Sequence, residues 1–365
     1  GGVVPIVDGG EVVLDAGGVP TGVLIDNACG LVGSIIPPHP EPRRLEALME
    51  AQANLLAHGI VGVTDAGLSP AEIERIDALQ QSGALKLRVN ALVSASDENI
   101  AWLVDSGRRI EDMLVVNGVK FYMDGALGSR GALLRQPYSD RTGWFGLATQ
   151  RKQEFKRQIE TLHGHGLQAA THCIGDSATA LVLEAYADVL EGPNDLRWRI
   201  EHAQVVSEED VARFGGYSII PSVQPTHATS DMYWAGERLG RNRIRRAYAY
   251  QELLQALGMT ALGTDFPVED IDPRKTFAAA VARMDADGYP EGGFQPENAL
   301  TPEQALRGMT QWVALAQFQE NALGTIEVGK WADFTWMDRN WLEVDAQSVR
   351  KTRIYGTCIA GEWHH

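Results

Sequence analysis

Four polar residues each stand at the end of a short apolar run that reads as a buried β-strand. They are Lys120, His172, His202 and Asp265. Each run leads into a loop and then into a helix-like stretch. In a βα barrel the active site lies at the carboxyl ends of the strands, where residues far apart in sequence converge. Two imidazoles, a carboxylate and a lysine that could be modified would form a divalent-metal site.

The two histidines are the stronger half of this set. A single histidine after a strand is more often structural than a ligand. His172 and His202, however, occupy the same position in consecutive strand–helix units. Adjacent strand ends lie together in a barrel, so the pair is expected to share one site.

Asp265 and Lys120 each allow two interpretations. Asp265 lies in GTDFP and could cap a turn. Its place after the last strand favours a ligand that also accepts a proton from water and delivers it to the leaving group. Lys120 could pair with Asp124 or another carboxylate. Alternatively, burial could keep Lys120 neutral, so that it reacts with carbon dioxide to form a carbamate that bridges two metals.

Three loop residues are predicted to contact substrate. They are His227, Arg130 and Asp124. Arg130 could bind a substrate carboxylate or help to close a lid. An ordinary loop hydrogen bond is an equally good interpretation of His227 and Arg130.

Strand and helix patterns alternate along most of the chain, which predicts a parallel sheet. Seven barrel-type strands are expected near residues 60, 87, 115, 168, 199, 220 and 261. Ser69, Pro70 and Glu72 predict the start of a helix with a capping box, and so do Thr301, Pro302 and Gln304. A (β/α)₈ barrel needs an eighth strand, and the deficit lies before residue 60. We therefore expect either an incomplete barrel or a first strand that precedes Gly1.

Both ends of the chain lack the strand–helix alternation of the barrel. We predict a β-rich N-terminal segment or insertion at 1–42, a (β/α) barrel at 43–320 and a small β element at 321–363. His364 and His365 are interpreted as the remnant of a purification tag.

Composition narrows the class of protein. The formal net charge of −16 argues against nucleic acid or an anionic membrane as the partner. No run approaches the roughly 18 to 20 apolar residues of a membrane span, and no signal peptide is visible. The three cysteines are widely spaced and odd in number, which favours a reducing compartment. We expect a cytoplasmic enzyme with a small-molecule substrate, with homodimerisation left open.

Several motifs together resemble the amidohydrolase superfamily, and within it the metal-dependent hydrolases that include N-substituted formamide deformylase. They are PTGVLIDNA, VKFYMDGALGSRGA, THCIGDSA, RIEHAQ, SVQPTHATSDM, LGTDFPVE and GTIEVGKWADF. The resemblance implies a (β/α)₈ barrel with a small β-sandwich built from both chain ends. It also implies that His172 and His202 are metal ligands, that Asp265 is a ligand and the general base, and that Lys120 is a carboxylated bridge wherever two metals are bound.

One departure from the family is serious. The family has a His-x-His pair on its first barrel strand, and this chain has none there. Its only such pair, His163 and His165, lies at a predicted helix end. Three features are missing: the His-x-His pair, the first barrel strand and the first half of the β-sandwich. All three absences are explained if the sequence begins partway into the natural protein. The chain as printed is therefore expected to bind metal poorly.

The combined interpretation is a hydrolase that cleaves a C–N, amide-like bond with water activated by one or two divalent ions, zinc above all. Asp265 would be the general base. Two alternatives stay open. The protein could be a deaminase or esterase that uses the same site, or it could be a non-catalytic barrel that acts as a binding or scaffold protein.

Overall fold

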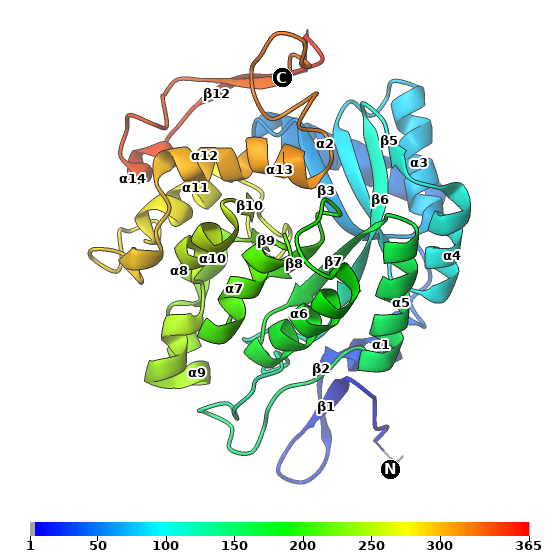
Figure 1. Cartoon of the computed structure of the whole chain (residues 1–365), viewed down its shortest axis with the longest axis vertical. Coiled ribbons are helices and arrows are strands. Elements are labelled where there is room, and N and C mark those ends of the chain that lie inside the picture. The colour runs from blue at the N-terminus through cyan, green and yellow to red at the C-terminus, as the bar shows by residue number, and fades with distance from the viewer. Residues whose placement is uncertain (1–3, 365) are drawn as a thin grey trace.

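A curled sheet of parallel strands forms the centre of the molecule (Figure 1). The computed structural model describes residues 4–364, so 1–3 and His365 lie outside it. The strand order is β10-β9-β8-β7-β6-β4-β3. The bounds are β3 (Gly62–Leu68), β4 (Arg88–Ser94), β6 (Leu114–Tyr122), β7 (Gln168–Cys173), β8 (Arg199–His202), β9 (Ile220–Val223) and β10 (Ala261–Leu262), with β5 (Arg109–Ile110) antiparallel to β6. All seven predicted barrel strands are confirmed.

The sheet is a half-barrel rather than a closed barrel. Within residues 4–364, β3 and β10 are its two ends and do not pair with each other. In β3, Gly62, Asp65 and Ala66 are exposed, whereas β4 beside it is buried except at its last residue. The predicted (β/α)₈ architecture is thus confirmed in part, and its first strand is not among the described residues.

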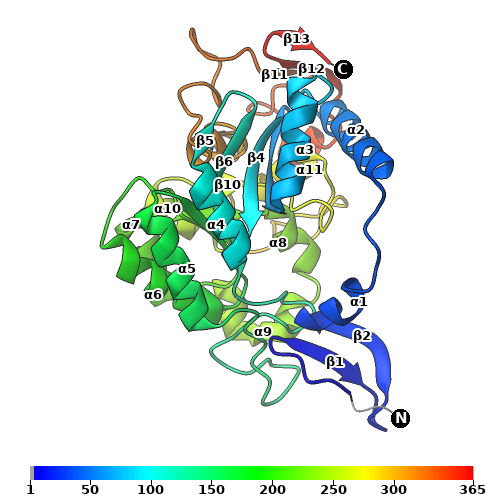
Figure 2. The same cartoon turned by 90° about the vertical axis from the view of Figure 1, so that its right-hand side faces the viewer.

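Helices cover the outer face of the sheet (Figures 1 and 2). Those between successive strands are α3 (Pro70–Gln81), α4 (Asp97–Ser106), α5 (Lys152–Gly164), α6 (Asp176–Leu190), α7 (Glu208–Gly216) and α10 (Tyr250–Leu257). The start of α3 is the predicted capping box: Ser69 N donates to Glu72 Oε2 at 2.8 Å, and Ser69 Oγ accepts from Glu72 N at 3.4 Å. Thr301 and Gln304 form the second predicted box at α12 (Pro302–Met309).

Strand alternation decides which side chains of β6 face the site. Phe121 is fully buried and packs edge-on against Phe155 of α5, with ring centroids 5.3 Å apart. Since successive side chains point to opposite faces, Lys120 and Tyr122 lie on the other, concave face. Local sequence and outer packing therefore direct Lys120 inward.

The N-terminal strands form a hairpin beside the carboxyl ends of the barrel strands. β1 (Gly10–Leu14) and β2 (Pro20–Asp26) pair with each other in a separate sheet. Arg141 in the loop after β6 binds Glu11 of this hairpin at 2.6 Å, and Asn27 Nδ2 donates to Thr149 O at 3.1 Å. The hairpin is thus attached to the same loop that follows Lys120.

The C-terminal strands lie at the opposite end of the molecule (Figure 2). β11 (Phe334–Met337), β12 (Ile354–Ile359) and β13 (Glu362–Trp363) form a three-stranded sheet. Thr357 Oγ1 donates to Leu56 O at 2.6 Å, which attaches this sheet near the amino ends of the barrel strands. The two terminal sheets do not pair, so a sandwich built jointly from both ends, as the resemblance implied, is not found in residues 4–364.

The remaining helices complete the shell. They are α1 (Gly30–Gly33), α2 (Glu41–Ala57), α8 (Pro225–Asp231), α9 (Ala235–Arg243), α11 (Pro273–Ala282), α13 (Gln311–Ala316) and α14 (Ala346–Val349), with 3₁₀ turns at Asn27–Cys29, Ile244–Arg246 and Pro296–Asn298. Among the described residues, no helix has both the length and the apolar character that crossing a membrane requires.

Candidate active site

The two predicted histidine ligands are neighbours at the strand ends. His172 lies in β7 and His202 ends β8, and the register pairs Cys173 with His202. The ring centroids of His172 and His202 are 4.5 Å apart. The ring of His227, from α8, is stacked 5.9 Å from that of His202. The sheet therefore brings together three imidazoles from three successive strand–helix units.

All three imidazoles are held in the neutral form. Burial, and then the nearby charge of Lys120, lower the pKa of His172 to about 3. Burial lowers the pKa of His202 well below its usual range, with His172 and Lys120 adding to the effect. Burial alone lowers the pKa of His227 to about 4. Neutral imidazole is the form that binds a metal ion.

Each ring has one nitrogen directed at a second residue. Nε2 of His172 lies 3.5 Å from Asp124 Oδ1, and Nδ1 of His202 lies 2.7 Å from Oε1 of Gln224. The backbone of His202 has a φ of 72°, in the left-handed region, which is uncommon for a histidine. The ring of His202 is thus set by an unusual backbone turn and by Gln224.

Asp265 faces the outermost of the three rings. Its Oδ2 lies 3.9 Å from Nε2 of His227. Burial raises the pKa of Asp265 to about 6, although the charge of Lys120 acts in the opposite direction. Asp265 also has a left-handed φ of 56°, so its carboxylate leaves the backbone at a sharp turn after β10. This places a proton acceptor beside the histidines.

Lys120 lies inside the half-barrel without a carboxylate partner. Its Nζ is 4.9 Å from the centroid of the Tyr122 ring, and the side chain is buried. Among the described residues it forms no ion pair with Asp124, whose Oδ1 lies 3.5 Å from Nε2 of the neutral His172. Burial lowers the pKa of Lys120, opposed by the charges of Glu201 and Asp265. In the described residues Lys120 therefore pairs neither with Asp124 nor with another carboxylate, and its carbamate role stays a prediction.

Asp124 is placed differently from the predicted substrate contact. Its Oδ1 accepts from Ile174 N at 3.0 Å, and its Oδ2 accepts from Gly175 N and Leu133 N, both at 2.8 Å. The carboxylate is fully buried, and burial raises its pKa to about 7 against these hydrogen bonds. Asp124 therefore binds the protein's own backbone instead of facing a substrate space.

Arg130 is also occupied by the protein. Its guanidinium forms a two-pronged pair with Asp140, with Nε–Oδ1 and Nη2–Oδ2 distances of 3.1 and 2.9 Å. Arg238 binds the same carboxylate. A substrate carboxylate would have to replace Asp140, so the substrate contact predicted for Arg130 stays a prediction.

The donor set resembles a metal site in kind but is not complete. Nε2 of His172 and Nε2 of His227 are buried without a hydrogen-bond partner, which suits atoms that meet a ligand. Yet across residues 4–364 no three His, Cys, Asp or Glu side chains converge closely enough to hold an ion. The ligand set of His172, His202, Asp265 and Lys120 is thus only partly assembled, and its role stays a prediction.

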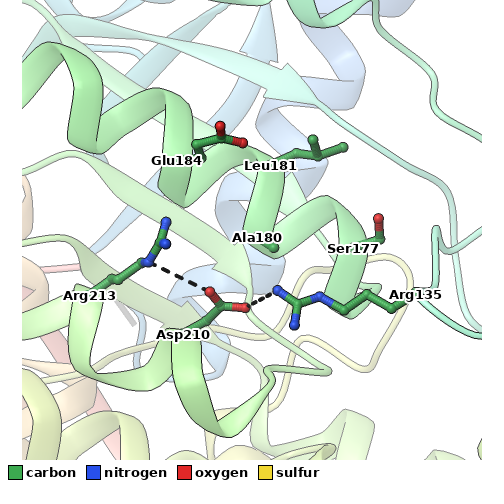
Figure 3. Close-up of a pocket in the computed structure, with 7 residues that line it drawn as sticks. All are labelled: Arg135, Ser177, Ala180, Leu181, Glu184, Asp210 and Arg213. Carbon is green, nitrogen blue, oxygen red and sulfur yellow. Dashed lines mark hydrogen bonds and ion pairs between the residues drawn. The ribbon is translucent and has the colours of Figure 1, made fainter.

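A separate surface cavity of about 200 Å³ lies between α6 and α7 (Figure 3). It is lined by Arg135, Ser177, Ala180, Leu181, Glu184, Asp210 and Arg213. The buried Asp210 binds Arg135 at 2.8 Å and lies 3.7 Å from Arg213. These charges neutralise one another on the helical layer, so they fasten the loop after β6 to α7 and offer no reactive group.

Gln224 is the site residue that the sequence analysis missed. It directly follows β9 and precedes Pro225, the first residue of α8. His172 and His202 were selected because they lie at the carboxyl ends of strands, and Gln224 meets the same criterion. It was missed because only potential metal ligands, and not amides, were considered.

Comparison of the sequence with known families agrees with the strand order and the histidine cluster. The model of the amidohydrolase family matches residues 4–364. The chain belongs to the amidohydrolase family. It is 31% identical to the protein LONG AFTER FAR-RED 3 of Arabidopsis thaliana over 97% of this chain and 63% of the plant protein. This amidohydrolase chain therefore spans less than two thirds of that relative's length.

Two further relatives are informative. The amidohydrolase chain is 25% identical to N-substituted formamide deformylase of Arthrobacter pascens, over 97% of this chain and 67% of that enzyme. It also resembles the crystal structure of an uncharacterized metal-dependent hydrolase from Pyrococcus horikoshii, with a TM-score of 0.75 and 28% identity. That likeness covers 93% of this chain and 65% of the archaeal one. The half-barrel is therefore an amidohydrolase fold.

Proposed function

We propose that this amidohydrolase cleaves the C–N bond of an amide-like small molecule with the help of a divalent metal ion, zinc above all. The observation that carries the proposal is the contact between two neutral imidazoles, His172 and His202, whose centroids are 4.5 Å apart at adjacent strand ends. The similarity to an enzyme named as a deformylase and to one named as a metal-dependent hydrolase supports it.

His172 and His202 would supply nitrogen donors and Asp265 an oxygen donor to the ion, a set that suits zinc in kind and is only partly assembled in the described residues. When bound, the ion lowers the pKa of a water molecule and polarises the substrate carbonyl. Asp265 accepts the proton of the attacking water and passes it to the departing amine. His227 would contact the carbonyl oxygen, since both ring nitrogens of His202 are engaged by Gln224 and the ion. Every one of these steps uses a side chain at the carboxyl end of the sheet.

Lys120 adds an optional bridge between two ions. Burial lowers its pKa, which makes the neutral amine more accessible. The neutral amine can attack carbon dioxide, forming an N–C bond and releasing one proton, so that a negatively charged carbamate replaces the neutral amine. No ion pair in the described residues competes for Nζ. Mass spectrometry of the protein kept under carbon dioxide would detect the added group.

The test of the function is turnover by the metal-loaded chain. Because the chain is expected to bind metal poorly, the purified protein would be assayed in excess Zn²⁺ after its metal content is measured, on a panel of N-formyl and N-acyl amines beside the matching esters. We expect hydrolysis of at least one amide, which Asp265→Asn abolishes without unfolding the protein. The matched control is Asp287→Asn, because Asp287 is an exposed carboxylate in the loop after α11.

Three outcomes would contradict the proposal. Full activity in Asp265→Asn would show that Asp265 is not the general base. Hydrolysis of esters but not amides favours the esterase alternative. Neither zinc binding nor turnover favours a non-catalytic barrel.

A further inference from the structure

The hydrogen bond between His202 and Gln224 decides which nitrogen of the imidazole faces the site. Nδ1 of His202 lies 2.7 Å from Oε1 of Gln224, and both residues are at least nine-tenths buried. A side-chain carbonyl oxygen can only accept a hydrogen bond. A neutral imidazole carries one N–H, so Nδ1 must hold the proton and Nε2 must present its lone pair.

We propose that Gln224 is a positioning residue that locks His202 in the Nδ1–H form and so leaves Nε2 free to bind a divalent cation. The inference rests on the proposed function only in assigning a cation to Nε2. A partner on the remote nitrogen orients the ring of a metal-binding histidine and raises its basicity.

Gln224 is itself held rigidly by the next layer of residues. The hydroxyl of Tyr250, at the start of α10, donates to Gln224 O at 3.0 Å. The guanidinium of Arg283 lies 5.2 Å from the centroid of the Tyr250 ring. Pro225 follows Gln224 and begins α8, which limits the backbone freedom of Gln224. The backbone of Gln224 is therefore held on both sides of the residue whose side chain meets His202.

Arg283 is unusual in this layer. It is fully buried, and it donates to Phe294 O at 2.8 Å and to Tyr248 O at 3.2 Å, while Nη2 has no partner. Burying a guanidinium without a carboxylate costs free energy. Its contact with the Tyr250 ring offsets part of this cost and fixes the ring whose hydroxyl holds Gln224.

The opposite orientation of the amide makes an opposite prediction. If the Gln224 amide were rotated by half a turn, its NH₂ group would donate to Nδ1 of His202. The ring proton would then be on Nε2 and would block that atom from binding a cation. The two arrangements differ in one observable property, the tautomer of His202.

The first experiment measures that tautomer in the metal-free protein. Long-range ¹H–¹⁵N correlation spectra distinguish the proton-bearing from the bare ring nitrogen, and the His202 signals are assigned by their loss in His202→Gln. We expect a proton-bearing Nδ1 and a bare Nε2. A proton-bearing Nε2 overturns the inference, whether or not the protein is a hydrolase.

The second experiment compares variants at Gln224. Gln224→Met removes the acceptor at similar volume, so the His202 signals should show a mixture of tautomers and the affinity for Zn²⁺ should fall by about 10- to 100-fold. Gln224→Glu keeps an acceptor and should retain the Nδ1–H form. Gln168→Met is the matched control, since Gln168 is a buried amide that donates to Ala316 O at 3.0 Å and does not contact the histidines.

These readouts separate the two proposals. An unchanged tautomer and an unchanged Zn²⁺ affinity in Gln224→Met overturn the positioning role. If wild-type protein has the Nδ1–H form but binds no Zn²⁺, the proposed function fails and the tautomer lock stands. If Gln224→Met does not fold, the wild-type spectrum and Gln224→Glu decide: loss of the Nδ1–H form in Gln224→Glu counts against the role.

Discussion

Oδ1 of Asp124 lies 3.5 Å from Nε2 of His172, although Asp124 follows β6 and His172 lies in β7. The same carboxylate accepts three backbone N–H groups, from Leu133 and from Ile174 and Gly175. One buried side chain therefore joins the loop after β6 to the end of β7. The position of His172 depends on this junction as well as on its own strand.

Asp124→Ala should loosen that junction. The three N–H groups would lose their acceptor in a buried environment, and we expect a loss of about 3 kcal/mol in the free energy of unfolding. Denaturant unfolding measures the loss, and hydrogen exchange should become faster at Leu133, Ile174 and Gly175. Asp105→Ala, on the exposed side of α4, is the control. Unchanged exchange at the three amides would show that Asp124 does not hold the loop.

His172→Ala should weaken the binding of Zn²⁺. Removing one imidazole from the pair should cost at least tenfold in affinity, about 1.4 kcal/mol. Titration calorimetry of the dialysed protein measures the change. His165→Ala is the matched control, because His165 is exposed at the end of α5. Equal affinities in the two variants would exclude His172 from the ligand set.

Asp231 should make stability depend on pH. Burial raises its pKa to about 6, even though it accepts from Tyr248 at 2.8 Å. The unfolded chain has a value of about 3.9, so between the two pKa values the folded state holds the proton more tightly. The contribution of Asp231 to the free energy of unfolding therefore falls as pH rises from about 4 to about 6.

Asp231→Asn removes this dependence. The difference in the free energy of unfolding between the variant and the wild-type protein should therefore shift with pH. As the pH rises from about 4 to about 7, it should move by about 2 kcal/mol in favour of the variant. Urea unfolding at both pH values measures the gain. Asp287→Asn should show none, since Asp287 is exposed. A stability difference between Asp231→Asn and wild type that is the same at both pH values would mean that the pKa of Asp231 is not raised.

Gly125→Ala should disturb the docking of the N-terminal hairpin. A Cβ atom at Gly125 would lie 2.1 Å from Oδ2 of Asp26, the last residue of β2. We expect a loss of about 1–3 kcal/mol in the free energy of unfolding. In Gly164→Ala the added methyl group meets nothing within 4 Å, so that variant is the control. If the clash is the cause, adding Asp26→Ala to Gly125→Ala should restore part of the loss.

Local sequence was sufficient for the strands, the helix starts and the strand-end positions of the histidines. The strands near His172 and His202 were predictable because burial in a parallel sheet demands continuous apolar runs. The capping box at Ser69 was predictable because its hydrogen bonds join residues three positions apart. Such signals depend on neighbours along the chain, which is why a single sequence contains them.

Contacts across the fold were decided only by the tertiary structure. Asp124 accepts from backbone N–H groups just after β7 and in the loop after β6, and Arg130 pairs with Asp140, and neither partner could be named from the sequence. The two terminal sheets share a β-rich composition yet lie at opposite ends of the half-barrel. The sequence alone determined that this protein has histidines and a carboxylate at strand ends. Which nitrogen, oxygen or backbone group each one meets depends on three-dimensional packing, because those partners come from other strands and carry no local pattern.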